Sequence, residues 1–240
     1  AFVLFVILVA AVSRAQFQKA WEVSSSPGWA QMPIIHNGRI YVQFDGYHSN
    51  GARLAEMDLR TGAVLRTMDR VGDATGAFVH NGKIYSFMSN YYLPNAARMN
   101  EIDLATWQLT RTINIGNATY VEYVPFDQES GFIFVRQQDP TDRYKGRLSA
   151  YRISDGQLVW SFPASGYAGG FDGCQAPIVA GDSVFIFVCN AYWSMGGQFI
   201  RVNKNTGVQI WAVTLTTAAS RGGYNNPIYD SDNDCFYVSE

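Results

Sequence analysis

A six-residue motif occurs twice in this chain, 44 residues apart. The two copies are His36-Asn37-Gly38-Arg39-Ile40-Tyr41 and His80-Asn81-Gly82-Lys83-Ile84-Tyr85. In each copy an Asn-Gly pair stands between apolar, β-prone residues, which is the pattern of a hairpin with a tight primed turn. Asn and Gly suit such a turn because both tolerate positive φ. The chain therefore contains at least two copies of one hairpin, and we expect it to be built from repeats.

The remaining sequence repeats a four-strand pattern, in which we label the strands a to d. The first repeat has strands at 31–36, 39–44, 52–58 and 63–68, and the second at 75–80, 83–88, 97–103 and 108–113. The third and fourth have a–b turns at 127–131 and 181–182 and c–d turns at 154–156 and 203–207, and a fifth begins at Asn226. Matching positions 58, 103, 152 and 203 are 45, 49 and 51 residues apart. This period predicts an all-β fold, a β-propeller of four-stranded antiparallel blades with about four and a half blades present.

The first c–d turn has the pattern Asp-x-x-Thr-Gly at 58–62, and the turns at 103–107 and 203–207 are variants of it. Asp can accept hydrogen bonds from the backbone of its own turn, and Gly takes the left-handed position. The second repeat has Trp107 where the first has Gly62. We therefore expect the turn of the second repeat to differ.

A tryptophan marks strand d in several repeats. Trp160 and Trp211 occupy this strand in the third and fourth repeats, and Trp21 lies in a similar short strand before the first repeat. In propellers a terminal strand often completes the last blade, so Trp21 is predicted to close the ring. The fifth repeat stops after strand b, so we expect the 240 residues to be part of a longer chain.

The N-terminus has the pattern of a secretion signal. Residues Phe2 to Val12 are apolar and precede Ser13-Arg14-Ala15, a small-x-small cleavage pattern. We predict a signal peptide at 1–15, a propeller domain at 16–240 and a secreted, extracellular or periplasmic location. After signal removal no membrane span is expected, although a signal anchor that stays attached is the alternative. The net charge of −2 gives no basic field, so no nucleic-acid partner is predicted.

Two segments identify a family resemblance. Residues 148–160 (LSAYRISDGQLVW) and 203–211 (NKNTGVQIW) resemble the repeat of the PQQ-like, or quinoprotein dehydrogenase-like, β-propellers. The resemblance implies that the Trp of each blade packs between blades. Arg66 and Arg111 replace it in the first two repeats. The family includes dehydrogenases that hold the quinone PQQ and calcium, and scaffolds that hold neither.

A second, smaller resemblance concerns residues 54–66 (LAEMDLRTGAVLR), which are similar to a repeat of the five-bladed glutaminyl cyclases. This resemblance implies a secreted transferase.

The two ends of such a sheet differ in what they can bind. The a–b and c–d turns lie at one end, here called the turn end, and they are short. The b–c loops lie at the other, the loop end, and are long and rich in aromatic and polar residues. Function concentrates on loops that a rigid scaffold holds, and Tyr, Trp and Arg dominate binding hot spots. We therefore predict a ligand- or partner-binding face at the loop end, made of Asp45, His48, Tyr91, Tyr92, Arg143, Tyr144, Tyr192 and Trp193. The alternative is that these loops pack on one another and close the ring.

Other candidate sites are weaker. His36 and His80 occupy equivalent repeat positions, which favours a structural role, and Asp230 to Asp234 resemble only the start of a calcium loop. No catalytic residue and no metal ligand is predicted. If the Gly181-Asp182 turn is a two-residue loop, Cys174 and Cys189 face each other and are predicted to form a disulfide. Asn117 is the one N-glycosylation sequon.

Three functions therefore remain open. The first is a secreted, non-catalytic binding or scaffold module whose protein, small-molecule or glycan ligand is unknown and which needs no cofactor. The second is a quinone-dependent dehydrogenase of alcohols or sugars, with PQQ and calcium as cofactors. The third is a glutaminyl cyclase-like transferase.

Overall fold

The computed structural model describes the strands and turns of the chain but not its long loops. The described residues are 21–22, 33–44, 53–69, 73–89, 97–115, 121–122, 124–142, 145–169, 177–188, 198–214, 228–230, 232–233 and 235–237. The predicted signal peptide at 1–15 and the domain start at residue 16 lie outside them. These two predictions therefore stay predictions.

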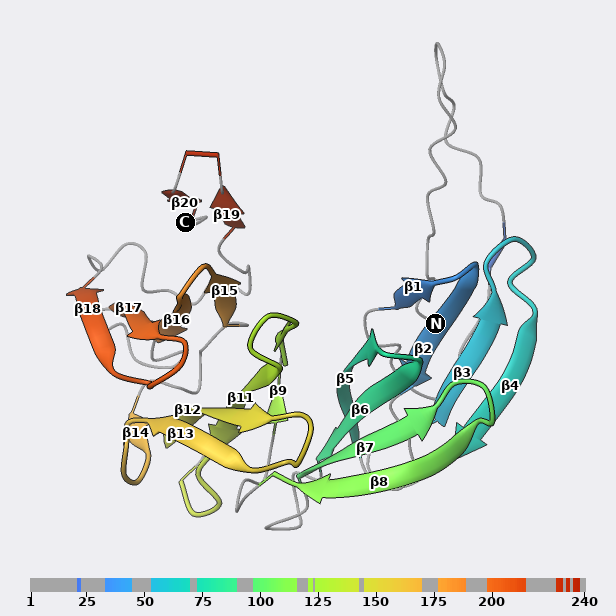
Figure 1. Cartoon of the computed structure of the whole chain (residues 1–240), viewed down its shortest axis with the longest axis horizontal. Coiled ribbons are helices and arrows are strands. Elements are labelled where there is room, and N and C mark those ends of the chain that lie inside the picture. The colour runs from blue at the N-terminus through green and yellow to red at the C-terminus, as the bar shows by residue number, and fades with distance from the viewer. Residues whose placement is uncertain are drawn as a thin grey trace. The chain divides into compact units, whose positions relative to one another are not determined.

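The described residues form four antiparallel sheets and one further hairpin, with no helix among them (Figure 1). The first sheet contains β1 (Ile34–His36), β2 (Arg39–Phe44), β3 (Arg53–Asp58) and β4 (Val64–Asp69). The second contains β5 (Asp73–His80), β6 (Lys83–Ser89), β7 (Arg98–Asp103) and β8 (Gln108–Asn114). The third contains β10 (Phe126–Asp127), β11 (Phe132–Gln138), β12 (Lys145–Arg152) and β13 (Leu158–Phe162), together with short β9 (Val121–Glu122) and β14 (Ala168–Gly169). The fourth contains β15 (Ile178–Ala180), β16 (Ser183–Val188), β17 (Gln198–Asn203) and β18 (Gln209–Thr214), and the hairpin is β19 (Ile228–Asp230) with β20 (Cys235–Tyr237).

The chain divides into two compact units. Unit 1 comprises residues 1–90 and 99–112, and unit 2 comprises residues 91–98 and 113–240. The first two sheets belong essentially to unit 1, and the third and fourth sheets with the final hairpin belong to unit 2. The strand order follows the sequence in every four-stranded path, as expected for propeller blades. The predicted all-β repeat of four-stranded antiparallel sheets is confirmed.

Side chains that point to alternate faces of the strands fill the space between neighbouring sheets of each unit. In β2, Ile40 and Val42 pack beside Trp21, whereas Tyr41 on the opposite face packs against Ile84 of the second sheet. In unit 2 the same rule brings Phe134 of the third sheet against Val184 of the fourth. Both faces of the inner strands are thus buried, because successive strand residues point to opposite sides.

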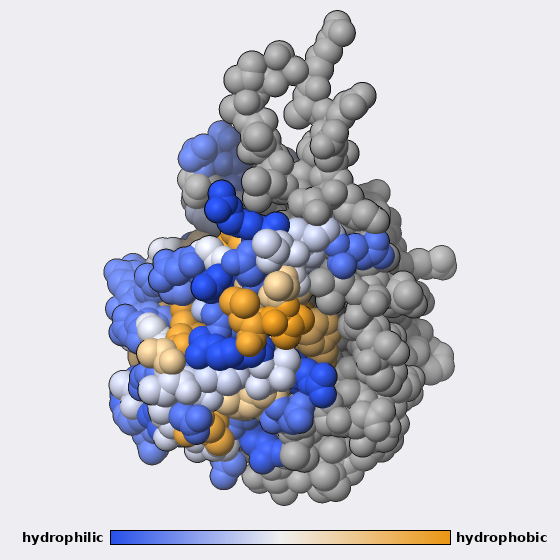
Figure 2. Space-filling view, turned by 90° about the vertical axis from the view of Figure 1, so that its right-hand side faces the viewer, coloured by the Kyte–Doolittle hydropathy of each residue, from blue (hydrophilic) through white to orange (hydrophobic). Residues whose placement is uncertain are grey.

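The outer strands are far more open. In unit 1 the exposed large apolar residues include Val64 and Leu65 of β4 and Leu109 of β8. Figure 2, which views the molecule from the side on which β4 lies in Figure 1, shows apolar residues grouped among hydrophilic ones.

The c–d turns are built as the sequence predicts. The Asp58 carboxylate accepts hydrogen bonds from the backbone N–H groups of Arg60 (3.0 Å) and Thr61 (2.9 Å) and from the Thr61 hydroxyl (3.0 Å). Asp103 and Asn203 make the same three bonds in their own turns.

The expectation that the Trp107 turn differs is wrong. Trp107 has a φ of 59°, close to the 70° of Gly62, and the Trp107 N–H donates to the Asp103 carbonyl at 2.8 Å, as the Gly62 N–H donates to the Asp58 carbonyl at 2.9 Å. A left-handed backbone costs a non-glycine residue roughly 1–2 kcal/mol. Burial of the Trp107 indole offsets this cost.

Each of these turns receives a side chain from a preceding segment of the chain, which is β13 for Trp160 and a residue outside the strands for Trp21. The indole N–H of Trp160 donates to the carbonyl of Lys204 at 2.8 Å, and that of Trp21 donates to the carbonyl of Leu59 at 3.0 Å. Both carbonyls belong to the residue directly after the Asp or Asn of the turn. The two indole rings lie flat against turn glycines, because a Cβ added to Gly207 or Gly62 would come within 2.6 Å of the ring. The predicted packing of Trp160 between sheets is confirmed.

The first and second sheets reverse this arrangement. Arg66 stands where Trp160 stands in the third sheet, and its Nη2 donates to the Leu104 carbonyl at 2.9 Å. The indole now comes from the turn itself, since Trp107 occupies the glycine position and the Arg66 guanidinium lies 4.7 Å from the centre of its ring. Arginine and tryptophan have therefore exchanged sides of the interface.

A buried glutamate accompanies each arginine of this kind. Glu56, opposite Arg66 in the register of β3 and β4, accepts hydrogen bonds from Arg66 and forms an ion pair with Arg39 at 3.3 Å. Glu101 binds Lys83 (2.5 Å) and Arg111 (2.6 Å) in the same way. Burial would raise the pKa of the Glu101 carboxyl, but hydrogen bonds from Lys83, Thr110 and Arg111 hold it below its usual range. The carboxylate therefore stays charged and compensates the charge of Arg111.

The contact between Trp160 and Gly207 can be tested against a glycine that has no neighbour. Gly38 and Gly207 have similar φ values of 71° and 68°, but nothing lies within 4 Å of a Cβ added to Gly38. Gly38→Ala should cost about 1 kcal/mol of unfolding free energy through backbone strain alone. Gly207→Ala should cost about 1–3 kcal/mol more, because the methyl group collides with the indole. Urea unfolding of both variants measures the difference, and equal losses would contradict the packing described here.

Candidate functional site

The residues predicted to form the binding face lie outside the described residues. Asp45 and His48 follow β2, Tyr91 and Tyr92 follow β6, Arg143 and Tyr144 follow β11, and Tyr192 and Trp193 follow β16. Each pair falls between the second and third strands of a sheet, as predicted. The binding face that these residues are predicted to form therefore stays a prediction.

At the turn end of unit 2, the charged groups around Lys204 are satisfied internally. Lys204 is 3% exposed in its side chain, and its ammonium lies 2.9 Å from Asp127 and 3.0 Å from Glu129. Burial alone would lower the pKa of this ammonium, but its hydrogen bonds to the Asp127 and Glu129 carboxylates raise the pKa above its usual value. The backbone N–H of Lys204 also donates to the Asp182 carbonyl at 2.8 Å. Lys204 therefore connects its own turn to the turn that contains Asp127 and Glu129 and to the turn that contains Asp182.

The loop end of the third sheet carries a row of polar side chains instead. Gln137 of β11 lies opposite Arg147 of β12, and the pairing of Gly146 with Ala168 places Tyr167 next to Arg147 on the other side. Further along the same face, Ser149 of β12 lies opposite Ser161 of β13. We call Gln137, Arg147, Ser149, Tyr151, Ser161 and Tyr167 the polar row.

Gln137 is the centre of this row. Its side chain is fully buried, and its amide nitrogen donates to the Ile115 carbonyl (2.8 Å) and the Tyr151 hydroxyl (2.9 Å). Its amide oxygen accepts from Arg147 Nε (2.8 Å) and from the Ser149 hydroxyl (2.7 Å). Ser149 in turn lies within hydrogen-bond distance of Ser161 at 3.0 Å. All the donor and acceptor positions of the amide are thus used, which fixes its orientation.

An interruption of the outer strand brings Tyr167 into the polar row. Residues 163–167 leave the sheet after β13, and the chain pairs with β12 again only at β14. The Tyr167 ring then lies under the guanidinium of Arg147, with 4.8 Å between the guanidinium carbon and the ring centre.

Both tyrosines of the row stay protonated at neutral pH. Burial raises the pKa of the Tyr151 hydroxyl above its usual value. Burial also raises the pKa of Tyr167, and the Asp139 charge adds to this effect while Arg147 opposes it. Their hydroxyl groups are therefore hydrogen-bond donors, and neither is a ready base or nucleophile.

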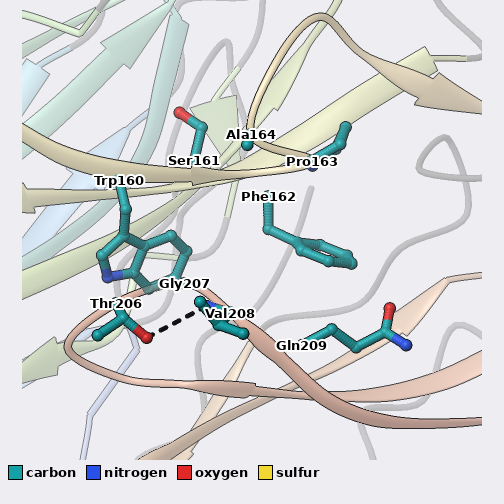
Figure 3. A pocket seen from close by; sticks show the side chains of 9 residues that line it. All are labelled: Trp160, Ser161, Phe162, Pro163, Ala164, Thr206, Gly207, Val208 and Gln209. Atoms are coloured by element: carbon teal, nitrogen blue, oxygen red, sulfur yellow. Dashed lines mark hydrogen bonds between the residues drawn. The ribbon is translucent and has the colours of Figure 1, made fainter.

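A pocket of about 470 Å³ lies on the outer side of unit 2, next to the same interruption. It is bounded by Trp160, Phe162 and Pro163 from one sheet and by the turn from Thr206 to Gln209 of the next. Figure 3 shows the Phe162 ring directed toward Val208 and Gln209 across this space. The lining contains no charged side chain.

No described residues form a metal site. Among the described ranges, no three His, Cys, Asp or Glu side chains lie close enough together to hold an ion. Asp230 instead accepts from the backbone of Asp232 (3.0 Å) and Asn233 (3.2 Å), as the Asp of the other turns does.

Two smaller predictions also fall outside the described residues. Cys174, Cys189 and Asn117 are not described, so the disulfide and the glycosylation stay predictions. The register on which the disulfide prediction depends is confirmed, since Ile178 pairs with Phe185 and Ala180 with Ser183 around a two-residue turn.

The polar row was not predicted from the sequence. Its one local signal is the polar run Arg136-Gln137-Gln138 that ends the strand at 132–138 after four apolar residues. The partners of Gln137 come from two other segments, the residue Ile115 and strand β12, and only the addition of Tyr167 to the row depends on the interruption at 163–167.

Comparison with known proteins agrees with this architecture. Residues 121–233 match the model of a PQQ-repeat family described as outer membrane protein assembly factor BamB. A search of curated proteins by sequence finds no match.

Solved structures with a similar fold include proteins of several kinds. BamB from Moraxella catarrhalis is 16% identical with a TM-score of 0.53, and the match covers 81% of this chain and 51% of that one. A europium-containing methanol dehydrogenase is 11% identical with a TM-score of 0.56, covering 93% and 49%. Hydrazine synthase from Kuenenia stuttgartiensis is 9% identical with a TM-score of 0.61, covering 79% and 54%. The chain thus spans about half the length of these proteins, and identities this low establish the fold alone.

One further finding concerns membranes. Within the described residues, no helix has the length and apolar character needed to cross a bilayer.

The role of Gln137 can be tested by removing its amide. Gln137→Ala leaves the Tyr151 and Ser149 hydroxyls and the Ile115 carbonyl without their partner, and it should cost about 3 kcal/mol of unfolding free energy or more. Gln157→Ala is the matched control, because this side chain is exposed, and it should change stability by less than about 0.5 kcal/mol. Denaturant unfolding measures both. A similar loss for the two variants would contradict the network.

Proposed function

We propose that this chain, which is built of PQQ-like β-propeller repeats, is a secreted, non-catalytic binding or scaffold module. It binds its partner through the loop-end face. The contrast between the two ends of the sheets carries this proposal. At the turn end, the Asp and Asn side chains, the carbonyls that follow them and Lys204 are engaged within the fold. At the loop end, the strands hold long connections rich in Tyr, which also contain His48 and Trp193.

The comparisons support a role in binding other proteins. The matching family is described as an assembly factor of the outer membrane, and BamB from Moraxella catarrhalis shares the fold. An assembly factor acts by contact with other proteins, which is also what a rigid set of sheets with variable loops can provide. A periplasmic or extracellular location agrees with the apolar run and cleavage pattern at residues 2–15.

A quinone-dependent dehydrogenase is the second candidate, because a methanol dehydrogenase shares the fold over 93% of this chain. Calcium would need a set of oxygen ligands, and the described residues provide no such cluster. Under the first proposal, full-length protein mixed with the quinone and calcium should not reduce an electron-acceptor dye when alcohols or sugars are added. Sustained dye reduction would favour this second candidate.

The binding face can be tested by site-specific photo-crosslinking. A photoreactive amino acid placed singly at His48, Tyr92, Tyr144 or Trp193 should crosslink one partner in extracts of the source cells. The same group at Asn37, Asn81 or Asp182, in the a–b turns, should not crosslink it.

Replacing Tyr91, Tyr92, Tyr192 and Trp193 together with Ser should abolish capture of the partner, because these side chains supply the binding area. The melting temperature should stay almost unchanged. Crosslinking of the same partner from the a–b turns, or collapse of the fold in the Ser variant, would contradict the proposal.

A further inference from the structure

Arg147 differs from Arg39 and Arg66 in having no carboxylate partner among the described residues. Arg201 shares this property, because its Nε donates to Ser183 and its guanidinium lies over the Phe185 ring. Arg39 is bound to Glu56 and Asp58, and Arg66 is bound to Glu56 and the Leu104 carbonyl. Arg147 uses only its Nε, which donates to Gln137, and its guanidinium lies over the Tyr167 ring. Within the described part of the chain, its two terminal nitrogens have no hydrogen-bond acceptor and no carboxylate partner. The terminal N–H groups of this half-buried guanidinium, here called the fork, are therefore available to donate hydrogen bonds to a ligand.

The fork is held in place before any ligand arrives. Gln137 receives the Arg147 Nε–H at 2.8 Å and is itself fixed by Ile115, Tyr151 and Ser149. On its other side the guanidinium is limited by the Tyr167 ring at 4.8 Å. An arginine held on two sides loses little further side-chain entropy on binding, and this raises its affinity for a ligand.

Neutral hydroxyl groups of the same row add donors. Tyr151 accepts from Gln137, so its own O–H proton is left to donate, and no described residue accepts it. The Tyr167 hydroxyl likewise has no acceptor within the described residues. The row therefore offers donors and one positive charge, which is the pattern that receives an anion.

The charge balance selects the kind of anion. Lys145 is already paired with Asp142 at 3.2 Å, and the Asp139 carboxylate is held by the backbone N–H and hydroxyl of Thr141, both at 2.7 Å. Arg147 is therefore the cation beside the row that has no ion-pair partner in the described region, whereas Asp139 keeps its negative charge near Tyr167. A singly charged, planar carboxylate fits its two parallel donors, whereas a phosphate dianion would require a second cation.

We propose that Arg147 is the anchor for a carboxylate of the bound partner, which is a peptide segment presenting its C-terminus or an acidic side chain at the loop end of the third sheet. Tyr167 forms the wall of this subsite, and Gln137 acts as a positioning residue. The inference rests on the proposed function, since it names the chemistry that the loop-end face recognises.

The test uses full-length protein and three fluorescent alanine-rich peptides. The first has a free C-terminal carboxylate, the second is its C-terminal amide, and the third is amidated and carries one internal glutamate. Fluorescence anisotropy should show that at least one carboxylate peptide binds roughly tenfold tighter than the uncharged amide, and which one it is identifies the source of the carboxylate.

Variants then assign that preference to a residue. Arg147→Gln should abolish it, and Arg147→Lys should keep only part, because an ammonium retains the charge but loses the fork. Arg152→Gln is the matched control at the other end of the same strand, where Arg152 pairs with Asp155 at 2.6 Å, and it should bind like the unchanged protein. Unchanged melting temperatures for Arg147→Lys and Arg152→Gln exclude an effect of unfolding.

Several outcomes would overturn the inference. These are no measurable peptide binding, no preference for a carboxylate, a preference that survives Arg147→Gln, or an equal loss in Arg152→Gln. Arg147-dependent binding of the quinone, itself a carboxylate, without binding of either carboxylate peptide would also overturn the assignment to a peptide.

Failure of the inference can be told apart from failure of the proposed function. If the crosslinked partner is captured equally well by Arg147→Gln, the inference fails while the binding face stands. If the peptide preference depends on Arg147 but nothing crosslinks to the loop end, the proposed function fails while the carboxylate site stands.

Discussion

The fold depends on how each d-type strand is anchored in the turn that follows it. The carbonyl after the Asp or Asn of a c–d turn points toward the preceding strand, and a buried carbonyl must find a donor. Trp21 and Trp160 supply that donor and cover the turn with an aromatic ring at the same time. One side chain thus satisfies a polar group and fills the interface. This contact fixes the c–d turns of the first and fourth sheets, and the strands that these turns join carry the connections at the opposite end.

The exchange between Arg66 and Trp107 shows what this interface requires. It needs one donor for the carbonyl and one large flat group, and these can come from opposite sides. The exchange is not without cost. The Trp107 indole N–H is buried and has no partner within the described residues, which costs about 1–3 kcal/mol. Arg66 in turn needs the carboxylate of Glu56 beside it. The cation–π contact and the hydrogen bond to Leu104 offset these losses.

Local patterns predicted the strands and their pairing, because turn residues and alternation act over a few positions. The register around Gly181-Asp182 is an example, since Ala180 pairs with Ser183 as a two-residue turn demands. The Trp107 turn was mispredicted because intrinsic preference was outweighed by burial of the indole between two sheets. The polar row could not be predicted, because Arg147 meets Tyr167 only across the irregular segment 163–167, which has no periodicity. The predicted loop residues, from His48 to Trp193, depend on loop structure that strand patterns do not determine.

The paired anchors also limit how such a chain can grow by internal duplication. The fourth repeat carries Gly207, which accepts an indole, and Trp211 at the position that supplies one. A tandem copy of this repeat would therefore match itself at the new border. The first repeat also has an indole-accepting glycine, Gly62, but it ends in Arg66, so its copy would place a cation against a turn without the tryptophan that receives it. A repeat like the fourth can therefore multiply by a single copying event. A repeat like the first can multiply only together with its neighbour.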